Sequence, residues 1–195
     1  MVLPAEMKKY PTAQERHPNA PRALIDASSA ILLHKAGLIR SCCETFNLLM
    51  TDSVYNEVSV PDQPDAAGLR ALIGQQPGIC VLDDPAEPIP ACYAADLGRL
   101  HRGERKTLQH CLNGAARFVI IDDGKGVKVC RRLNIPHVNA LLCPQLIHFS
   151  GRMPDARQAW FYRECIARLG RYSTEVIAWA ETCERSALAF FINDQ

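Results

Sequence analysis

The chain has 195 residues, of which 48% are hydrophobic, and its 22 Lys and Arg against 21 Asp and Glu give a formal net charge of +1. This length is typical of one compact domain with a short extension, and the apolar fraction excludes an intrinsically disordered chain. The balanced charge excludes a uniformly basic surface for a polyanion. The longest apolar run, 187–192, is too short to cross a bilayer, so no membrane association is expected.

Residues 1–21 predict a flexible N-terminal arm, because this end of the chain is rich in proline and has no apolar segment that could form a secretory signal. The chain also has nine cysteines, an odd number, and no pair of them has the Cys-x-x-Cys spacing of common zinc sites. Most of the cysteines lie in apolar stretches, so we expect buried free thiols and a reducing, cytoplasmic location.

From Arg22 to residue 150, short apolar strands alternate with helical periods. The predicted strands are 23–26, 47–51, 79–82, 117–121 and 136–139. The predicted helices are 28–35, 54–58, 66–73, 93–100, 104–112 and 127–133. This alternation implies an α/β domain over 22–150, with a central parallel sheet, right-handed crossovers and flanking helices.

Beyond Gly151 the pattern becomes purely helical. Asp155 is expected to begin a helix that ends near residue 169, and Ser173 to begin a second one. In the second helix, apolar residues fall at helical spacing as far as Phe191. We therefore expect residues 151–195 to form a helical extension that packs on the domain or on a partner.

Acidic residues stand where the predicted strands end. Asp26 ends the first strand, and the adjacent Asp122 and Asp123 follow the most apolar one. Ligands of parallel sheets gather at the carboxyl ends of strands, and neighbouring carboxylates repel each other unless a cation lies between them. Hard divalent ions such as Mg²⁺ and Mn²⁺ suit oxygen ligands of this kind.

Glu57 and Glu104, near the starts of two predicted helices, are further candidates. Each acid also has a purely structural explanation. A Glu in the first turn complements the helix dipole, and Asp-Asp-Gly at 122–124 can simply form a turn. Only the combination of all these positions favours a site.

Several motifs resemble the PIN-domain nuclease family, and the resemblance covers about residues 22–150. The segments that resemble it are Leu24 to Ser29, His34 to Leu38, Thr51 to Val58, Arg102 to Arg105, Val119 to Gly126 and Arg131 to Ile135. The family implies a three-layer α/β sandwich with a central parallel sheet, to which this chain would add its C-terminal helices. It also implies a metal-dependent nuclease of the kind that includes VapC-type toxins, which usually act on RNA.

By this resemblance, Mg²⁺ or Mn²⁺ would activate a water molecule at a site with these catalytic residues: Asp26, Glu57, Glu104, Asp123 and Asp122. All but Glu57 would be metal ligands, and Asp123 is favoured over Asp122. Ser28 would orient Asp26 or contact the substrate or a metal-bound water. Basic residues cluster near two of the acids, and among them Arg102, Arg105 and Lys125 would contact the RNA backbone. An ordinary solvated helix face explains any one of these basic residues about equally well. An antitoxin protein and a homodimer are the partners implied besides RNA.

Two other classes of α/β protein fit less well. A haloacid-dehalogenase-like phosphatase needs a second carboxylate where this chain has Ser28, and a phosphoacceptor receiver domain has its acidic pair early in the chain. The alternative that stays open is a PIN-like domain that binds a protein or RNA without cutting, since a fold does not by itself establish chemistry.

Overall fold

The computed structural model describes residues 19–61, 64–73, 75 and 78–192. Of the predicted N-terminal arm, residues 1–18 lie outside this described part. The core of the domain is a parallel sheet of five strands in the order β3-β2-β1-β4-β5. The strands are β1 (Arg22–Ile25), β2 (Asn47–Thr51), β3 (Cys80–Leu82), β4 (Phe118–Ile120) and β5 (His137–Val138). The predicted α/β class and parallel sheet are confirmed.

The strand order reverses beside β1. From β1 the chain moves outward through β2 to β3, and it then returns so that β4 pairs with the other side of β1. Leu24 of β1 is in register with Leu49 of β2 and Val119 of β4. The carboxyl ends of β1 and β4 therefore meet at the reversal, the position where parallel sheets bind ligands.

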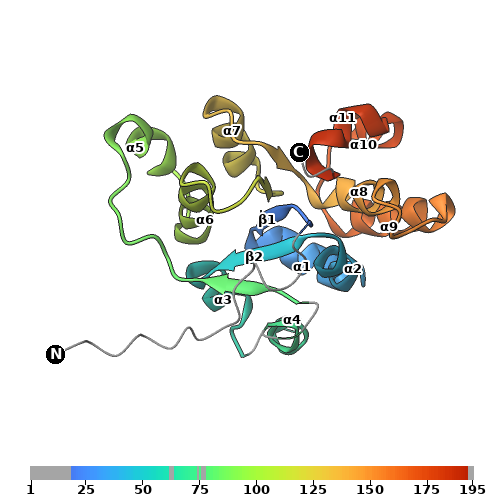
Figure 1. The fold of residues 1–195 in the computed structure, drawn as a ribbon, viewed down its shortest axis with the longest axis horizontal. Helices are drawn as coiled ribbons and strands as arrows, with labels where there is room; N and C mark the ends of the chain where they lie inside the picture. Colours follow the sequence, from blue (N-terminus) through green and yellow to red (C-terminus); the bar gives the residue numbers. More distant parts are fainter. Residues whose placement is uncertain (1–18, 62–63, 74, 76–77, 193–195) are drawn as a thin grey trace.

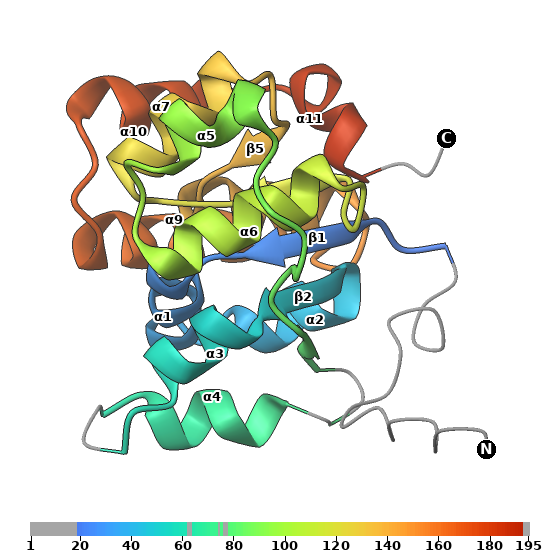
Figure 2. The same ribbon diagram turned by 90° about the vertical axis from the view of Figure 1, so that its left-hand side faces the viewer.

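Alternate side chains of the strands pack on two helical layers. Ala23 and Ile25 belong to the core shared with α1 (Ala27–Lys35), α2 (Ile39–Thr45) and α8 (Cys143–Phe149), whereas Leu24 packs on the opposite face. That second face is covered by α5 (Ala91–Leu97), α6 (Arg102–Leu112) and α7 (Gly124–Arg132). Figure 1 shows the sheet between these layers, and Figure 2 shows α5 and α6 in front of it. The result is a three-layer sandwich.

Two further helices, α3 (Asp52–Val58) and α4 (Ala66–Leu72), follow β2 and match the predicted helices. The helices α2 and α8 and the short 3-10 helix Ala140–Leu142 were not predicted. In α8, five of seven residues are buried, so it has no polar face that would give a helical period.

The C-terminal extension consists of α9 (Ala156–Leu169), α10 (Thr174–Thr182) and α11 (Arg185–Ile192). The prediction of one continuous helix from Ser173 to Phe191 is wrong, because Cys183 has an extended backbone and separates α10 from α11. Ile166, Ala180 and Leu188 are buried in the same core as the strands. The break at Cys183 allows both α10 and α11 to bury an apolar residue there.

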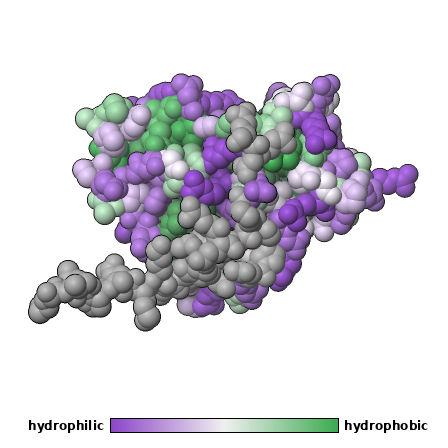
Figure 3. All heavy atoms as spheres, viewed as in Figure 1, coloured by the Kyte–Doolittle hydropathy of each residue, from purple (hydrophilic) through white to green (hydrophobic). Residues whose placement is uncertain are grey.

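The surface has both hydrophilic and apolar areas. Figure 3 shows a mostly hydrophilic face with two apolar areas, one over α5 to α7 and one near α11. Nine cysteines lie in the described part, none in a disulfide, and most are buried, although Cys92 is exposed. None of the helices in that part has the length and apolar character needed to span a membrane.

Candidate active site

Asp26 directly follows β1 and forms the N-cap of α1. Its Oδ1 accepts a hydrogen bond of 2.8 Å from the Ser29 amide, and its Oδ2 accepts one of 2.7 Å from the Ser28 hydroxyl. A short polar side chain with an extended backbone is the usual start of a helix. Asp26 is only 2% exposed, so this helix cap lies inside the protein at the edge of the sheet.

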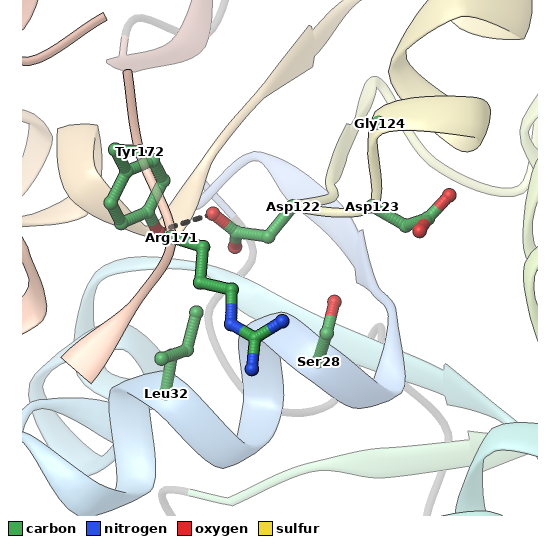
Figure 4. A pocket seen from close by; sticks show the side chains of 7 residues that line it. All are labelled: Ser28, Leu32, Asp122, Asp123, Gly124, Arg171 and Tyr172. Carbon is green, nitrogen blue, oxygen red and sulfur yellow. Dashed lines mark hydrogen bonds between the residues drawn. The ribbon is translucent and has the colours of Figure 1, made fainter. Parts of the chain in front are cut away.

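Asp122 and Asp123 follow β4 and point in opposite directions (Figure 4). Adjacent residues of an extended segment alternate in this way. The carboxylate of Asp122 accepts hydrogen bonds from the Ser29 hydroxyl at 2.7 Å, from the Ala140 amide at 3.0 Å and from the Tyr172 hydroxyl. Asp122 is therefore held on both of its oxygens.

Asp26 and Asp122 form the inner pair of the site, and Ser29 links them because it bonds to both. Burial, together with the neighbouring charge of Asp122, raises the pKa of Asp26 to about 7. Burial also raises the pKa of Asp122, and the hydrogen bonds from Tyr172, Ser29 and Ala140 oppose this shift. The inner pair is thus electrostatically unfavourable when both carboxyl groups are charged.

Glu104 and Asp123 form the outer pair, at the starts of α6 and α7. Glu104 accepts a hydrogen bond of 3.3 Å from the His101 amide, and Asp123 caps α7 by accepting from the amides of Lys125 at 2.7 Å and Gly126 at 3.1 Å. Burial, and then the charges of Asp123 and Glu57, raise the pKa of Glu104 to about 7. The outer pair therefore interacts directly.

Glu57 is exposed on α3 and lies against the start of α6. A Cβ atom on Gly103 would stand 3.0 Å from Glu57 Oε2 and 3.2 Å from Val54 Cγ2, so the absence of a side chain at Gly103 allows α3 to approach. A pocket of about 210 Å³ opens there, lined by Ser53, Asn56, Glu57, Arg102 and Gly103. This contact places Glu57 beside the outer pair.

The five predicted acids thus lie at one end of the sheet, but they do not converge on one point. Among the residues that the structure describes, no group of three or more His, Cys, Asp or Glu side chains is arranged to hold a metal ion. The chemistry of the donors nevertheless fits a hard divalent cation. All are carboxylate oxygens. The pKa values of Asp26 and Glu104 are raised by burial and by the charges of neighbouring acids, and bound positive charge would oppose both effects.

The predicted substrate-binding residues have different surroundings. Ser28 is exposed at the pocket beside Asp26, although its hydroxyl bonds to that carboxylate. Arg102 forms an ion pair of 3.2 Å with Asp84, Arg105 is half-buried on α6, and Lys125 is exposed in the first turn of α7. Arg102 is therefore partly neutralised, whereas Lys125 is accessible.

Sequence reasoning missed three residues of this site. Ser29 lies in a motif that resembles the family, but its link between the two aspartates was not predicted. Arg171 and Tyr172 come from the connection between α9 and α10, and nothing in the sequence marks them as neighbours of Asp122. All three surround or support a second pocket of about 340 Å³, lined by Ser28, Leu32, Asp122, Asp123, Gly124, Arg171 and Tyr172.

Comparison with known protein families places the chain in one of them. Residues 22–143 match the model of a family, DUF3368, that is described as a PIN domain. The matched segment contains all the predicted site residues and ends before the C-terminal helices. No curated protein and no solved structure matches the chain.

Proposed function

Because the chain belongs to the DUF3368 family of PIN domains, which are generally nucleases, we propose that it is a divalent-metal-dependent endoribonuclease that hydrolyses RNA phosphodiester bonds. The observation that supports this proposal most strongly is the position of the acids. Asp26 and Asp122 follow the two strands that flank the reversal of strand order, and Glu104 and Asp123 lie beside them. The raised pKa values of Asp26, Asp122 and Glu104 mean that charge on these buried or half-buried groups is costly to the fold, which favours a functional role.

The residues that would hold Mg²⁺ or Mn²⁺ are Asp26, Glu104 and Asp123, with Asp122 as a fourth ligand. When bound, such an ion lowers the pKa of a water molecule and neutralises charge on the phosphate that is attacked. Ser28 orients Asp26 through the hydrogen bond to Oδ2. Glu57 adds negative charge next to Glu104, and this strengthens the local attraction for a cation.

The substrate would lie across the exposed edge of these acids. Arg102, Arg105 and Lys125 lie on α6 and α7, the helices that begin at the outer pair. Contacts from such residues to phosphates give affinity without base selectivity. This arrangement is consistent with RNA held by its backbone.

Metal titration and RNA cleavage test the proposal together. We expect calorimetry to detect saturable Mn²⁺ binding by the wild-type protein. Asp26→Asn and Glu104→Gln should weaken it by more than about tenfold, since loss of a residue that only supports a metal ligand already costs about 10–100-fold. Cleavage of a labelled single-stranded RNA should require Mn²⁺ or Mg²⁺, stop with EDTA, and be lost in both variants. Glu184→Gln, an exposed acid on the C-terminal extension, is the matched control and should behave as wild type.

A non-catalytic PIN-like domain is the second candidate, and two observations favour it. The described residues contain no ready group of three metal-binding side chains, and both oxygens of Asp122 already accept hydrogen bonds. If the wild-type protein binds RNA but neither binds Mn²⁺ nor cleaves, the non-catalytic function replaces the nuclease.

The role of a toxin, an antitoxin partner, a homodimer and a cytoplasmic location stay predictions from the resemblance and from cysteine usage. Co-expression with the product of a neighbouring gene would test the toxin role, because an antitoxin should restore growth that the wild-type protein stops and that Asp26→Asn does not.

A further inference from the structure

The connection between α9 and α10, residues 170–173, reaches the end of β4 although it lies beyond the segment that matches the family. The Tyr172 hydroxyl donates a hydrogen bond to Asp122 Oδ1 and so attaches the connection to the candidate site. Gly170 makes this possible, because a Cβ atom there would stand 2.3 Å from Tyr172 Cε2. The connection is therefore fixed on the pocket by a specific contact.

Arg171 is the residue that this contact brings to the pocket. In Figure 4 its side chain extends across the opening, and the guanidinium points toward Ser28. Arg171 is exposed, and within the described part of the chain it forms no ion pair with an acid. Asp122 and Asp123 both line the same pocket, but Asp122 faces Tyr172, and Asp123 points away from Tyr172 and Arg171.

The pocket is acidic, so a guanidinium that pairs with no acid there would favour the binding of a phosphate. The pocket is lined by two carboxylates and has a third, Asp26, beneath Ser28. A phosphodiester that enters would be repelled by these groups. The guanidinium offers several N–H donors in one plane, a geometry that matches two phosphate oxygens at once. Leu32 beside it provides an apolar wall.

We propose that Arg171, from the C-terminal extension, binds a backbone phosphate of the RNA in the pocket beside Ser28. This inference rests on the proposed nuclease function. It assigns to the extension a part of the substrate site, and it makes Tyr172 a positioning residue that keeps Arg171 over the pocket through its bond to Asp122.

Binding of a fluorescently labelled single-stranded RNA of mixed sequence, measured by anisotropy in EDTA at several salt concentrations, tests the inference. We expect Arg171→Gln to weaken binding about tenfold and to reduce the slope of log affinity against log salt by about 0.7, the value for one phosphate contact of a single strand. Arg171→Lys should keep the salt slope and lose part of the affinity, because it retains the charge but not the planar donors. Arg168→Gln, an exposed arginine at the end of α9, is the matched control and should leave the affinity and the slope unchanged.

Calorimetry with Mn²⁺ and the melting temperature should be the same for Arg171→Gln as for wild type, because Arg171 is neither a metal ligand nor part of the core. Equal RNA affinity and salt slope in Arg171→Gln and Arg168→Gln would overturn the inference and leave the nuclease proposal intact. If the wild-type protein binds no RNA in EDTA, the inference fails, whereas the proposed nuclease function is decided separately by cleavage of RNA in Mn²⁺.

Discussion

Asp26 is both the N-cap of α1 and the most buried carboxyl group of the candidate site. As a cap it stabilises the helix, since Ser29 N–H would otherwise have no partner. As a buried acid near Asp122 it is costly when charged, and its pKa in the folded protein is raised to about 7 from 3.8. These two effects can be separated by a substitution that keeps the acceptor and removes the charge.

Asp26→Asn should therefore stabilise the metal-free protein at high pH. The folded state of the wild type keeps a proton on Asp26 that the unfolded state has released, so the free energy of unfolding falls as pH rises from about 4 to about 7. The asparagine variant lacks this loss and retains an Oδ1 acceptor for Ser29. We expect the variant to be more stable by roughly 1–3 kcal/mol at pH 8, and less so at pH 5.5, in urea titrations with EDTA.

Ser28→Ala, measured in parallel, removes a hydrogen bond to Asp26 without removing its charge and should not stabilise the protein at pH 8. A stability difference between Asp26→Asn and wild type that does not depend on pH would contradict the electrostatic explanation.

At the scale of elements, α7 packs closely on the end of β4, and two glycines of this helix have opposite surroundings. A Cβ atom on Gly126 would stand 2.3 Å from Ile121 Cδ1, whereas nothing lies within 4 Å of such an atom on Gly124. Neither glycine has a positive φ. The close approach at Gly126 allows Asp123 to cap the helix beside Glu104.

Gly126→Ala should destabilise the protein by about 1–3 kcal/mol, because the added methyl group overlaps a buried isoleucine. Gly124→Ala should be neutral or stabilising by up to about 1 kcal/mol, since alanine favours the helix. Thermal unfolding followed by circular dichroism would measure both. A Gly126→Ala protein as stable as Gly124→Ala would show that α7 does not pack on Ile121 in this way.

At the scale of the whole molecule, the C-terminal helices share one core with the sheet. Leu188 of α11 and Ile166 of α9 are buried in the same cluster as Ile25 of β1. The two tryptophans of the chain, Trp160 and Trp179, both lie in this extension, so their fluorescence reports on it, whereas circular dichroism reports on every helix. A shared core should unfold as one unit.

We expect fluorescence and circular dichroism to give coincident urea transitions. Leu188→Ala should lower the free energy of unfolding measured by both methods by about 2–4 kcal/mol, the usual cost of a buried leucine truncation. Ser186→Ala, on the exposed side of α11, should change it by less than about 0.5 kcal/mol. An earlier fluorescence transition, with an unchanged main transition by circular dichroism, would mean that the extension unfolds independently.

The sequence by itself determined the sheet and the places of the acids along the chain. A run such as Phe118 to Ile121 is apolar at every position because a central parallel strand is buried on both faces. Asp26 and Asp122 stand directly after such runs, so their position at the carboxyl edge follows from chain order alone. The same local patterns did not predict α8, because five of its seven residues are buried and no polar face marks a helical period. They also did not predict the end of α10 at Cys183, because the apolar residues keep their helical spacing across this break.

Only the tertiary structure decided how the site is assembled. The sequence favours Asp123 over Asp122 as the metal ligand but does not show that the two side chains separate. After β4, Asp122 is directed toward Ser29 and Tyr172 and Asp123 toward Glu104, so the acids form two pairs. Tyr172 lies 50 positions from Asp122, and its contact arises because the extension folds back over the core. Side-chain direction and long-range contacts depend on packing between elements, which no local sequence pattern contains.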